Sequence, residues 1–357
     1  MQNTKRNSVF DLLKLVFAVI IALLHYNWRI VPQGYLAVEF FLILGGGLIY
    51  KGSEKYRREK LLTIFQRKLS SVYFYYVILM VLGIAYILVV NKEKYSIGVW
   101  MLRVCRIGLM YPYIFGDTTG QAFWLPWGHV WYIPVWLVGS ILCIMIVRDE
   151  NMQRMRYVIV FVTLFLLGVV YNASEIHTVN VTIEVNIGTF SFGFIRGLMD
   201  LFIGMLTGIV SEQLASWKVL NKRLFSLVKG LLLFLDLSVM LLIITHEVTC
   251  EGDYIFCFLS ACLICMINMQ FDWCTNLLDK IGTKLGVICQ LSIPIYFFHL
   301  VMIKILAYLG YNSTSVRGIA GYLLCVFIVA MIGQIVENKL KKIYFSFKQK
   351  IIFIEVS

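Results

Sequence analysis

The sequence predicts an all-α polytopic membrane protein with about ten transmembrane helices and with both termini in the cytoplasm. The fold class follows from composition: of the 357 residues, 60% are hydrophobic and 15% are charged, and the mean hydropathy is +0.81. A soluble domain has roughly 45–50% apolar and about 25% charged residues. The nine cysteines are scattered, several of them within apolar runs, so neither zinc nor a disulfide framework is indicated.

The apolar segments give the number of helices. A helix needs about 20 residues to cross a bilayer, and on that basis we expect spans at residues 9–30, 33–50, 70–91, 129–147, 157–172, 188–211, 226–246, 254–271, 286–306 and 317–336. The first is not expected to be a cleavable signal peptide, because Lys5 and Arg6 precede it and no small-x-small cleavage site follows it. No repeat, linker or second domain is visible, so residues 1–357 are expected to form one membrane domain.

The distribution of charge predicts the orientation of these spans. With the N-terminus inside, 23 of the 32 Lys and Arg residues fall in cytoplasmic segments, including a tail at 338–357. The outer loops 173–187 and 247–253 have none. This is the positive-inside pattern. It accounts for the net charge of +12 without a nucleic-acid partner.

One apolar segment is not expected to cross. Residues 95–115 contain Arg103 and Arg106, and a crossing here would turn every later basic loop to the outside. We therefore expect an interfacial or re-entrant segment within the outer loop 92–128.

The first span carries ionisable groups on one face. "FDLLKLVFAVIIALLHYNW", residues 10–28, includes Asp11, Lys14 and His25. Lys14 and His25 fall within ~20° of each other around a helix and ~16 Å apart along it. Asp11 and Lys14 can be explained as a cytoplasmic helix end with a snorkelling lysine. His25 is not explained in this way, because a polar group inside a span usually faces the bundle interior or a water-filled cavity.

Other polar residues are expected at the depth of His25. Glu39 lies near the outer end of the second span. In the ninth span, Ser292, Tyr296 and His299 have the i, i+4, i+7 spacing of one helical face. His25 and His299 can be functional, or they can serve only as hydrogen-bonding groups between helices.

The remaining polar residues of the spans also have a structural explanation beside a functional one. Arg196 and Asp200 are an i, i+4 pair of opposite charge, which can neutralise itself and lock the bundle. Trp131, at the outer end of the fourth span, has the position of an interface anchor. We expect its neighbour His129 to lie on the outer surface, and we place Asp236 well inside the seventh span.

Two classes of function fit these residues. A neutral imidazole beside a carboxylate, in a cavity that opens outward, is the arrangement expected of a general base acting on a hydroxyl group. The basic segment from Lys51 to Lys68 can hold a polyanionic donor, with Lys14 on the route between donor and base. A proton-coupled transporter also needs His, Glu and Asp at mid-depth, so the residues alone do not separate the two.

The order of the motifs resembles the membrane acyltransferase 3 family from residue 8 to about residue 340. "FDLLKLVFAVIIALLH" is similar to the family's first-span signature, an Asp, a basic residue three positions later and then a His; here these are Asp11, Lys14 and His25. "GYLAVEFFLILGGGLI" resembles the next segment, with Glu39 in the acidic position. "FQRKLSSVYFYY", "HVWYIPVW", "DLFIGMLTG" and "LSIPIYFFH" resemble later family segments in the same order.

The sequence departs from the family pattern at two places. Lys68 and Ser71 stand where an Arg-x-x-Arg pair is usual, and Phe74 replaces the following proline. The family's Ser-Gly-Phe reads Gly45-Gly46-Gly47. Lysine does not replace arginine in a bidentate phosphate grip, although Arg67 is adjacent. These changes concern the donor side more than the histidine.

The resemblance implies an enzyme of the bacterial cytoplasmic membrane. Such proteins move an acyl group, usually acetyl, from cytoplasmic acyl-coenzyme A to a hydroxyl of a surface polysaccharide or lipid-linked sugar, without a metal. It implies that His25 is catalytic with Glu39 beside it. The residues expected to assist coenzyme A are Lys14, Arg57, Arg58, Arg67 and Lys68, and those expected to support the substrate or the site are Asp11, Arg196, Asp200, Trp131, Ser292, Tyr296 and His299.

Two other functions stay open at this point. An exporter or flippase of glycan intermediates would use the same cavity without covalent chemistry, and paired broken helices would favour it. The five prolines and the Gly45-Gly46-Gly47 run keep that alternative open. A sensor that binds acyl-coenzyme A without turnover is the third. The oligomeric state is not indicated.

Overall fold

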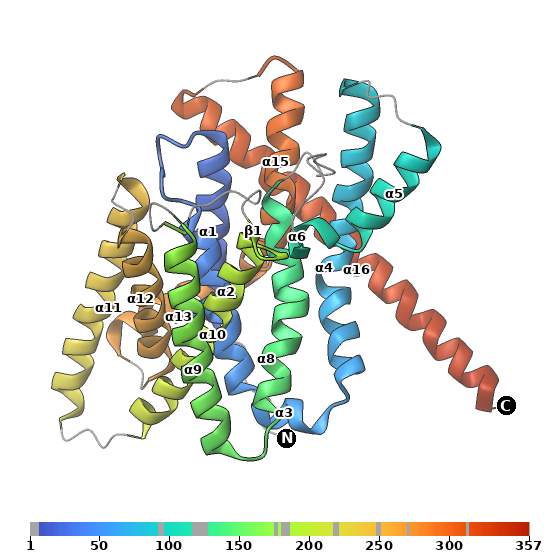
Figure 1. Ribbon diagram of the computed structural model, residues 1–357. Coiled ribbons are helices and arrows are strands. Elements are labelled where there is room, and N and C mark those ends of the chain that lie inside the picture. The colour runs from blue at the N-terminus through green and yellow to red at the C-terminus, as the bar shows by residue number, and fades with distance from the viewer. Residues whose placement is uncertain are drawn as a thin grey trace.

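The computed structural model describes residues 7–91, 96–115, 128–174, 178–179, 186–216, 221–247, 251–269, 272–311 and 314–356. They form a bundle of helices with one short antiparallel ladder, β1 (Asn186–Ile187) and β2 (Phe190–Ser191) (Figure 1). The α-helices are α1 (Ser8–Tyr26), α2 (Leu36–Lys51), α3 (Ser53–Arg58), α4 (Leu61–Tyr86), α5 (Ile97–Gly108), α6 (Tyr111–Phe115), α7 (Tyr132–Pro134), α8 (Ser140–Val147), α9 (Met152–Ala173), α10 (Phe192–Ala215), α11 (Lys222–Thr245), α12 (Glu251–Asn268), α13 (Trp273–Lys284), α14 (Gly286–Cys289), α15 (Ser292–Tyr308) and α16 (Val316–Val356).

The helix lengths make the chain an all-α polytopic membrane protein, as predicted. Among the described residues, eight helical segments are long and apolar enough to cross a bilayer, and they correspond to eight of the ten predicted spans. The second and ninth predicted spans form α2 and α15, of 16 and 17 residues. At 1.5 Å per residue these helices are about 24 and 26 Å long, somewhat shorter than a hydrocarbon core of ~30 Å.

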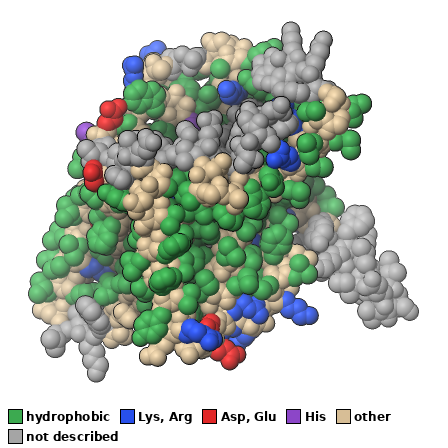
Figure 2. Space-filling view, in the orientation of Figure 1, with side chains coloured by type: hydrophobic (Ala, Val, Ile, Leu, Met, Phe, Trp, Pro, Cys, Tyr) green, Lys and Arg blue, Asp and Glu red, His purple; other side chains and the backbone are tan. Residues whose placement is uncertain are grey.

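The surface has the polarity expected of a protein in a bilayer. Figure 2 shows hydrophobic side chains across the middle of this face, with Lys, Arg, Asp and Glu nearer its upper and lower ends. Large apolar residues such as Phe161 on α9 and Phe234 on α11 are exposed. An apolar surface of this extent is unusual for a protein in water and is normal against lipid.

The centre of the bundle is a close crossing of α2 and α10. A methyl group added at Gly46 would lie 1.9 Å from the carbonyl oxygen of Leu201, and one at Gly204 would lie 2.0 Å from that of Ile43. Only glycine allows the two backbones to approach so closely, the small-residue packing found between membrane helices. Because α2 continues without interruption through Gly45-Gly46-Gly47, this run is a packing surface and not a helix break.

The fourth predicted span is helical but irregular. It begins with a 3-10 turn, η2 (Gly128–Trp131), continues through α7 into a π-helical turn, η3 (Val135–Gly139), and ends in α8. π-Helical turns inside helices are frequent at functional sites. Here the irregular start directs His129 into the bundle.

The predicted non-crossing segment 95–115 forms α5 and α6. α5 has 12 residues, about 18 Å of helix, which is too short to cross. Arg103 and Ile107 are buried on one side, and Ile97 is exposed. The hydroxyl of Tyr76 in α4 donates to the Ile107 carbonyl oxygen, 2.5 Å away. The placement of this segment at the outer face stays a prediction.

The last predicted span and the predicted tail are one helix. α16 continues from Val316 to Val356, and its final part extends away from the bundle in Figure 1. The cytoplasmic position of residues 338–357 stays a prediction.

Candidate active site

Three histidine rings from distant parts of the chain meet inside the bundle. His25 lies in the last turn of α1, His129 in η2 and His299 in α15. The rings of His25 and His299 are stacked, with centroids 5.1 Å apart. The rings of His129 and His299 meet edge to face at 4.7 Å. His299 therefore contacts both of the other histidines.

The position of His129 corrects the expectation that it lies on the outer surface. Its side chain is only 5% exposed, and its ring lies 5.3 Å from that of Tyr296. The Tyr296 hydroxyl donates to the backbone carbonyl oxygen of His129, 2.6 Å away. The hydropathy of the sequence does not show that the His129 side chain points into the bundle. The available signal was the place of His129 in the His-x-Trp-Tyr stretch.

The surroundings of His299 determine which of its two ring nitrogens carries the hydrogen. The residue is fully buried, and Nδ1 lies 2.6 Å from the carbonyl oxygen of Tyr296. A carbonyl oxygen only accepts, so Nδ1 of the neutral ring carries the hydrogen. Nε2, which has no hydrogen-bond partner among the described residues, keeps the lone pair.

His25 differs from the other two histidines in exposure. It is exposed, whereas His129 and His299 are buried. A substrate approaching from outside the bundle therefore reaches His25 first. Within the part of the chain that the structure describes, no group of three or more His, Cys, Asp or Glu side chains is arranged to hold a metal ion.

A second cluster lies on α2 and α10. The Arg196 guanidinium forms an ion pair with Glu39, 2.6 Å apart, and both side chains are almost completely buried. Asp200, also buried, interacts electrostatically with both residues. Arg196 donates to the backbone carbonyl oxygen of Val179, and its guanidinium carbon lies 4.5 Å from the centre of the Trp131 ring.

This cluster corrects one expectation. Arg196 forms its ion pair with Glu39 of the neighbouring helix and not with Asp200 on its own helix, because the close crossing brings α2 against α10. Among the described residues no hydrogen bond or ion pair joins Glu39 to His25, and a role of Glu39 beside His25 stays a prediction. The two clusters are joined through Tyr296, whose ring contacts that of His299 and which interacts electrostatically with Arg196 and Glu39.

A cavity connects the ionisable residues of α1 with this region. It has a volume of about 180 Å³ and reaches from Lys14 to Ser292 and Tyr296. Lys14 Nζ lies 3.1 Å from Asp11 Oδ1. Ser292 and Tyr296 face the same space, as their spacing predicts. Tyr296, one of the lining residues, also contacts the rings of His129 and His299.

Both clusters and the cavity lie within a segment of the chain that matches a known protein family. The family model described as an acyltransferase domain matches residues 7–334, nearly the whole chain. This chain belongs to that acyltransferase family. No curated protein and no solved structure matches it.

In the acyltransferase, the basic residues before and at the start of α4 have different surroundings. Arg67 forms an ion pair with Glu59, 2.7 Å apart, and a hydrogen bond from this guanidinium lowers the pKa of the Glu59 carboxyl. Arg57 is paired with Glu54 at 2.6 Å and also donates to the Asp149 carbonyl oxygen at 3.2 Å. Arg58 is exposed. Arg57 therefore joins α3 to the α8–α9 turn, whereas the other two arginines lie nearer solvent.

Lys68 lies behind the wall of the cavity of the acyltransferase, against Trp136. Its ammonium lies 3.9 Å from the centre of the Trp136 ring, and Trp136 lines the cavity together with Ser71. The departure from the family's second arginine thus places a small hydroxyl side chain in the cavity wall. Of the residues predicted to assist the donor, Lys14 lines the cavity and Lys68 contacts Trp136 of its wall.

Proposed function

We propose that this acyltransferase transfers an acyl group, acetyl in the simplest case, from acyl-coenzyme A to a hydroxyl of a surface polysaccharide or lipid-linked sugar. The membrane is a bacterial cytoplasmic membrane, with the donor inside and the acceptor outside. The observation that supports this most strongly is the stacking of His25, an exposed residue, on the buried imidazole of His299, whose neighbour Tyr296 lines the cavity that reaches Lys14.

The size of the cavity indicates which part of the donor it takes. At about 180 Å³ it is smaller than the ~300–1,000 Å³ of most small-molecule sites. It therefore accommodates the acyl thioester end of the donor and not the nucleotide. The phosphates remain outside, within reach of Arg58, Arg67 and Lys68.

The chemistry needs one general base. The neutral imidazole of His25 accepts the proton of the acceptor hydroxyl while the hydroxyl oxygen attacks the thioester carbonyl carbon. The new C–O bond forms, the C–S bond breaks, and the proton passes from the imidazolium to the departing sulfur. The products are the ester and free coenzyme A.

The other residues of the site act by positioning. His299 stacks on His25, and Tyr296 holds the backbone of His129. The Glu39–Arg196 pair fixes α2 against α10 and places a guanidinium over Trp131. Glu39 thus supports the site through Arg196.

The test is thiol release by the purified protein in detergent, given acetyl-coenzyme A and an acceptor sugar, with the ester product followed by mass spectrometry. His25→Ala should lower the rate at least ~100-fold, the lower end of the contribution of a general base. The matched control is His246→Ala, because His246 is exposed at the end of α11, outside both clusters. Full activity of His25→Ala would remove this residue from the reaction. Glycan movement in vesicles without thiol release would instead support the exporter.

A further inference from the structure

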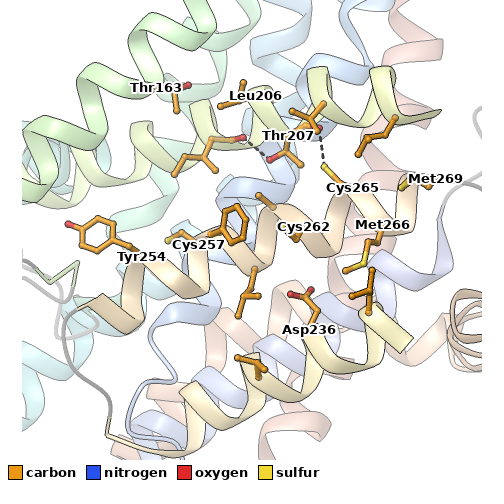
Figure 3. Close-up of a pocket in the computed structure, with 18 of the residues that line it drawn as sticks. Thr163, Leu206, Thr207, Asp236, Tyr254, Cys257, Cys262, Cys265, Met266 and Met269 are labelled. Carbon is orange, nitrogen blue, oxygen red and sulfur yellow. Dashed lines mark hydrogen bonds between the residues drawn. The ribbon is translucent and has the colours of Figure 1, made fainter. Parts of the chain in front are cut away.

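A second and larger cavity lies between α9, α10, α11 and α12. Its volume is about 740 Å³, and it shares no lining residue with the cavity at Lys14. Nearly all of its lining is apolar, for example Leu206 on α10 and Met266 on α12 (Figure 3). We call it the lateral groove. The proposed function does not use it.

The lateral groove opens toward the bilayer. α9 packs on α10, α10 on α12 and α12 on α11, so α9 and α11 form the two edges of the groove. Lining side chains on its outside are exposed: Leu235 is 58% exposed and Phe258 is 67% exposed. In a membrane, the medium that contacts these side chains is hydrocarbon.

Two tyrosines mark one end of the lateral groove. Tyr254, in the first turn of α12, lines it, and its ring lies 5.7 Å from that of Tyr171 near the end of α9. The predicted topology places this end at the outer leaflet. Tyrosines commonly lie at the level of the lipid head groups. The Tyr254 hydroxyl is buried and has no hydrogen-bond partner among the described residues.

We propose that the lateral groove binds one hydrocarbon chain of an outer-leaflet lipid, with the head group of that lipid at the level of Tyr254 and Tyr171. An apolar space left empty would forfeit the dispersion contacts of its lining, and a chain entering between α9 and α11 restores them. Lipid tails are as apolar as leucine, so it is the shape of the groove, and not a difference in polarity, that holds this chain more firmly than the surrounding lipids.

The lateral groove is next to the buried ion cluster. Cys257 lines the groove and interacts electrostatically with Asp200 and Glu39. Cys257 therefore belongs to the lining of the groove and lies within electrostatic range of these two carboxyl groups. The lipid site itself does not depend on the proposed function, because it rests on the groove alone.

Cys262 gives a test in the unmodified protein. It is half-buried in the lateral groove (Figure 3), and Cys325 on α16 is half-buried outside it. The delipidated protein in detergent is treated with an apolar maleimide, with and without added phosphatidylglycerol, and each cysteine is read by peptide mass spectrometry. We expect the lipid to slow labelling of Cys262 at least threefold and to leave Cys325 unchanged. Equal labelling of Cys262 with and without lipid would overturn the proposal.

A variant that fills the lateral groove gives a second test. Ala261→Trp places an indole at its wall, whereas Leu241→Trp, on the exposed face of α11, lies outside it. Native mass spectrometry should show one bound lipid fewer in Ala261→Trp than in Leu241→Trp. Equal lipid retention in the two would contradict the site. If Ala261→Trp does not fold, Cys262 protection still decides.

A substitution of Asp236 tests whether the lateral groove binds a hydrocarbon chain or a polar ligand. Its carboxyl lines the lateral groove (Figure 3), and Oδ2 is buried without a hydrogen-bond partner among the described residues. A hydrocarbon chain offers no donor to this group, so Asp236→Leu should retain lipid as well as the unmodified protein or better. Loss of lipid in Asp236→Leu would overturn the proposal and indicate a ligand that donates a hydrogen bond deep in the membrane.

Discussion

The imidazole rings of His25 and His299 are stacked, with centroids 5.1 Å apart and planes inclined by 26°. One ring is exposed and the other is fully buried. A substrate can touch the first and not the second. Under the proposed function, His299 acts as a positioning residue: Nδ1 is held by the Tyr296 carbonyl oxygen, and the ring stacks on that of His25.

This relationship predicts non-additive kinetics. When two residues act as one unit, removing both lowers the rate little more than removing the essential one alone. His299→Phe keeps an aromatic surface for stacking, so we expect its kcat to fall less than that of His25→Ala. The double variant should match His25→Ala. Thiol-release rates of the three variants check this, and independent, multiplying effects would show that His299 has a separate role.

The Glu39–Arg196–Asp200 cluster predicts that substitutions of its members lower the free energy of unfolding by different amounts. Removing one partner of a buried ion pair typically costs 3–5 kcal/mol, because the other charge is left unpaired. Arg196→Gln leaves two buried carboxyl groups without their cation, so we expect a loss of about 3–5 kcal/mol in the free energy of unfolding. Glu39→Gln should cost less, since Asp200 remains beside Arg196. Thermal unfolding in detergent measures both, and a larger loss for Glu39→Gln would contradict this order.

The Arg67–Glu59 pair predicts the pH dependence of donor binding. The Arg67 guanidinium lowers the pKa of Glu59 below its ordinary value of 4.5, so Glu59 stays ionised between pH 5.5 and 8 and the pair stays intact. We expect this pair to add no pH dependence to the KM for acyl-coenzyme A in that interval. Glu59→Gln releases Arg67 for the donor phosphates and should lower this KM about two- to fivefold, since an exposed pair contributes up to ~1 kcal/mol. An unchanged KM in Glu59→Gln would separate Arg67 from donor binding.

Periodicity in the sequence predicted the residues that share one helix, and it could not predict the contacts between helices. The i, i+4 spacing of Ser292 and Tyr296 placed both on the cavity side of α15. The partner of Arg196 could not be inferred, because it depends on how α2 crosses α10. His129 was assigned to the surface because it lies at the outer end of the fourth span, whereas the structure begins this span with a 3-10 turn in which His129 is buried.

Hydropathy also could not predict the lateral groove. Lipid-facing and cavity-lining positions are both apolar, so Leu235 and Phe258 have the same signal as any lipid-facing residue. Asp236 was recognised as lying inside a span, but its position in a groove requires the arrangement of four helices.

The close crossing of α2 and α10 predicts a sharp difference between two adjacent glycines. A methyl group at Gly46 would lie 1.9 Å from a carbonyl oxygen of α10, whereas one at Gly47 would meet its nearest neighbour, the Gly204 carbonyl oxygen, at 3.4 Å. Overpacking usually costs 1–3 kcal/mol, and a clash with backbone cannot be relieved by rotating a side chain. We expect Gly46→Ala to lose at least ~3 kcal/mol of stability. It should also lose activity, since separating the helices pulls Glu39 away from Arg196.

Gly47→Ala is the matched control for this prediction. The new methyl group makes ordinary contacts, and alanine favours a helix over glycine by roughly 0.5–1 kcal/mol. The variant should therefore be as stable as the unmodified protein or slightly more stable, with its thiol-release rate unchanged. Comparing the unfolding temperatures of the two variants isolates the crossing from the general effect of adding a methyl group. If Gly46→Ala matched Gly47→Ala in both stability and rate, α2 and α10 would not be in backbone contact, and the Glu39–Arg196 pair would lose the packing that holds it.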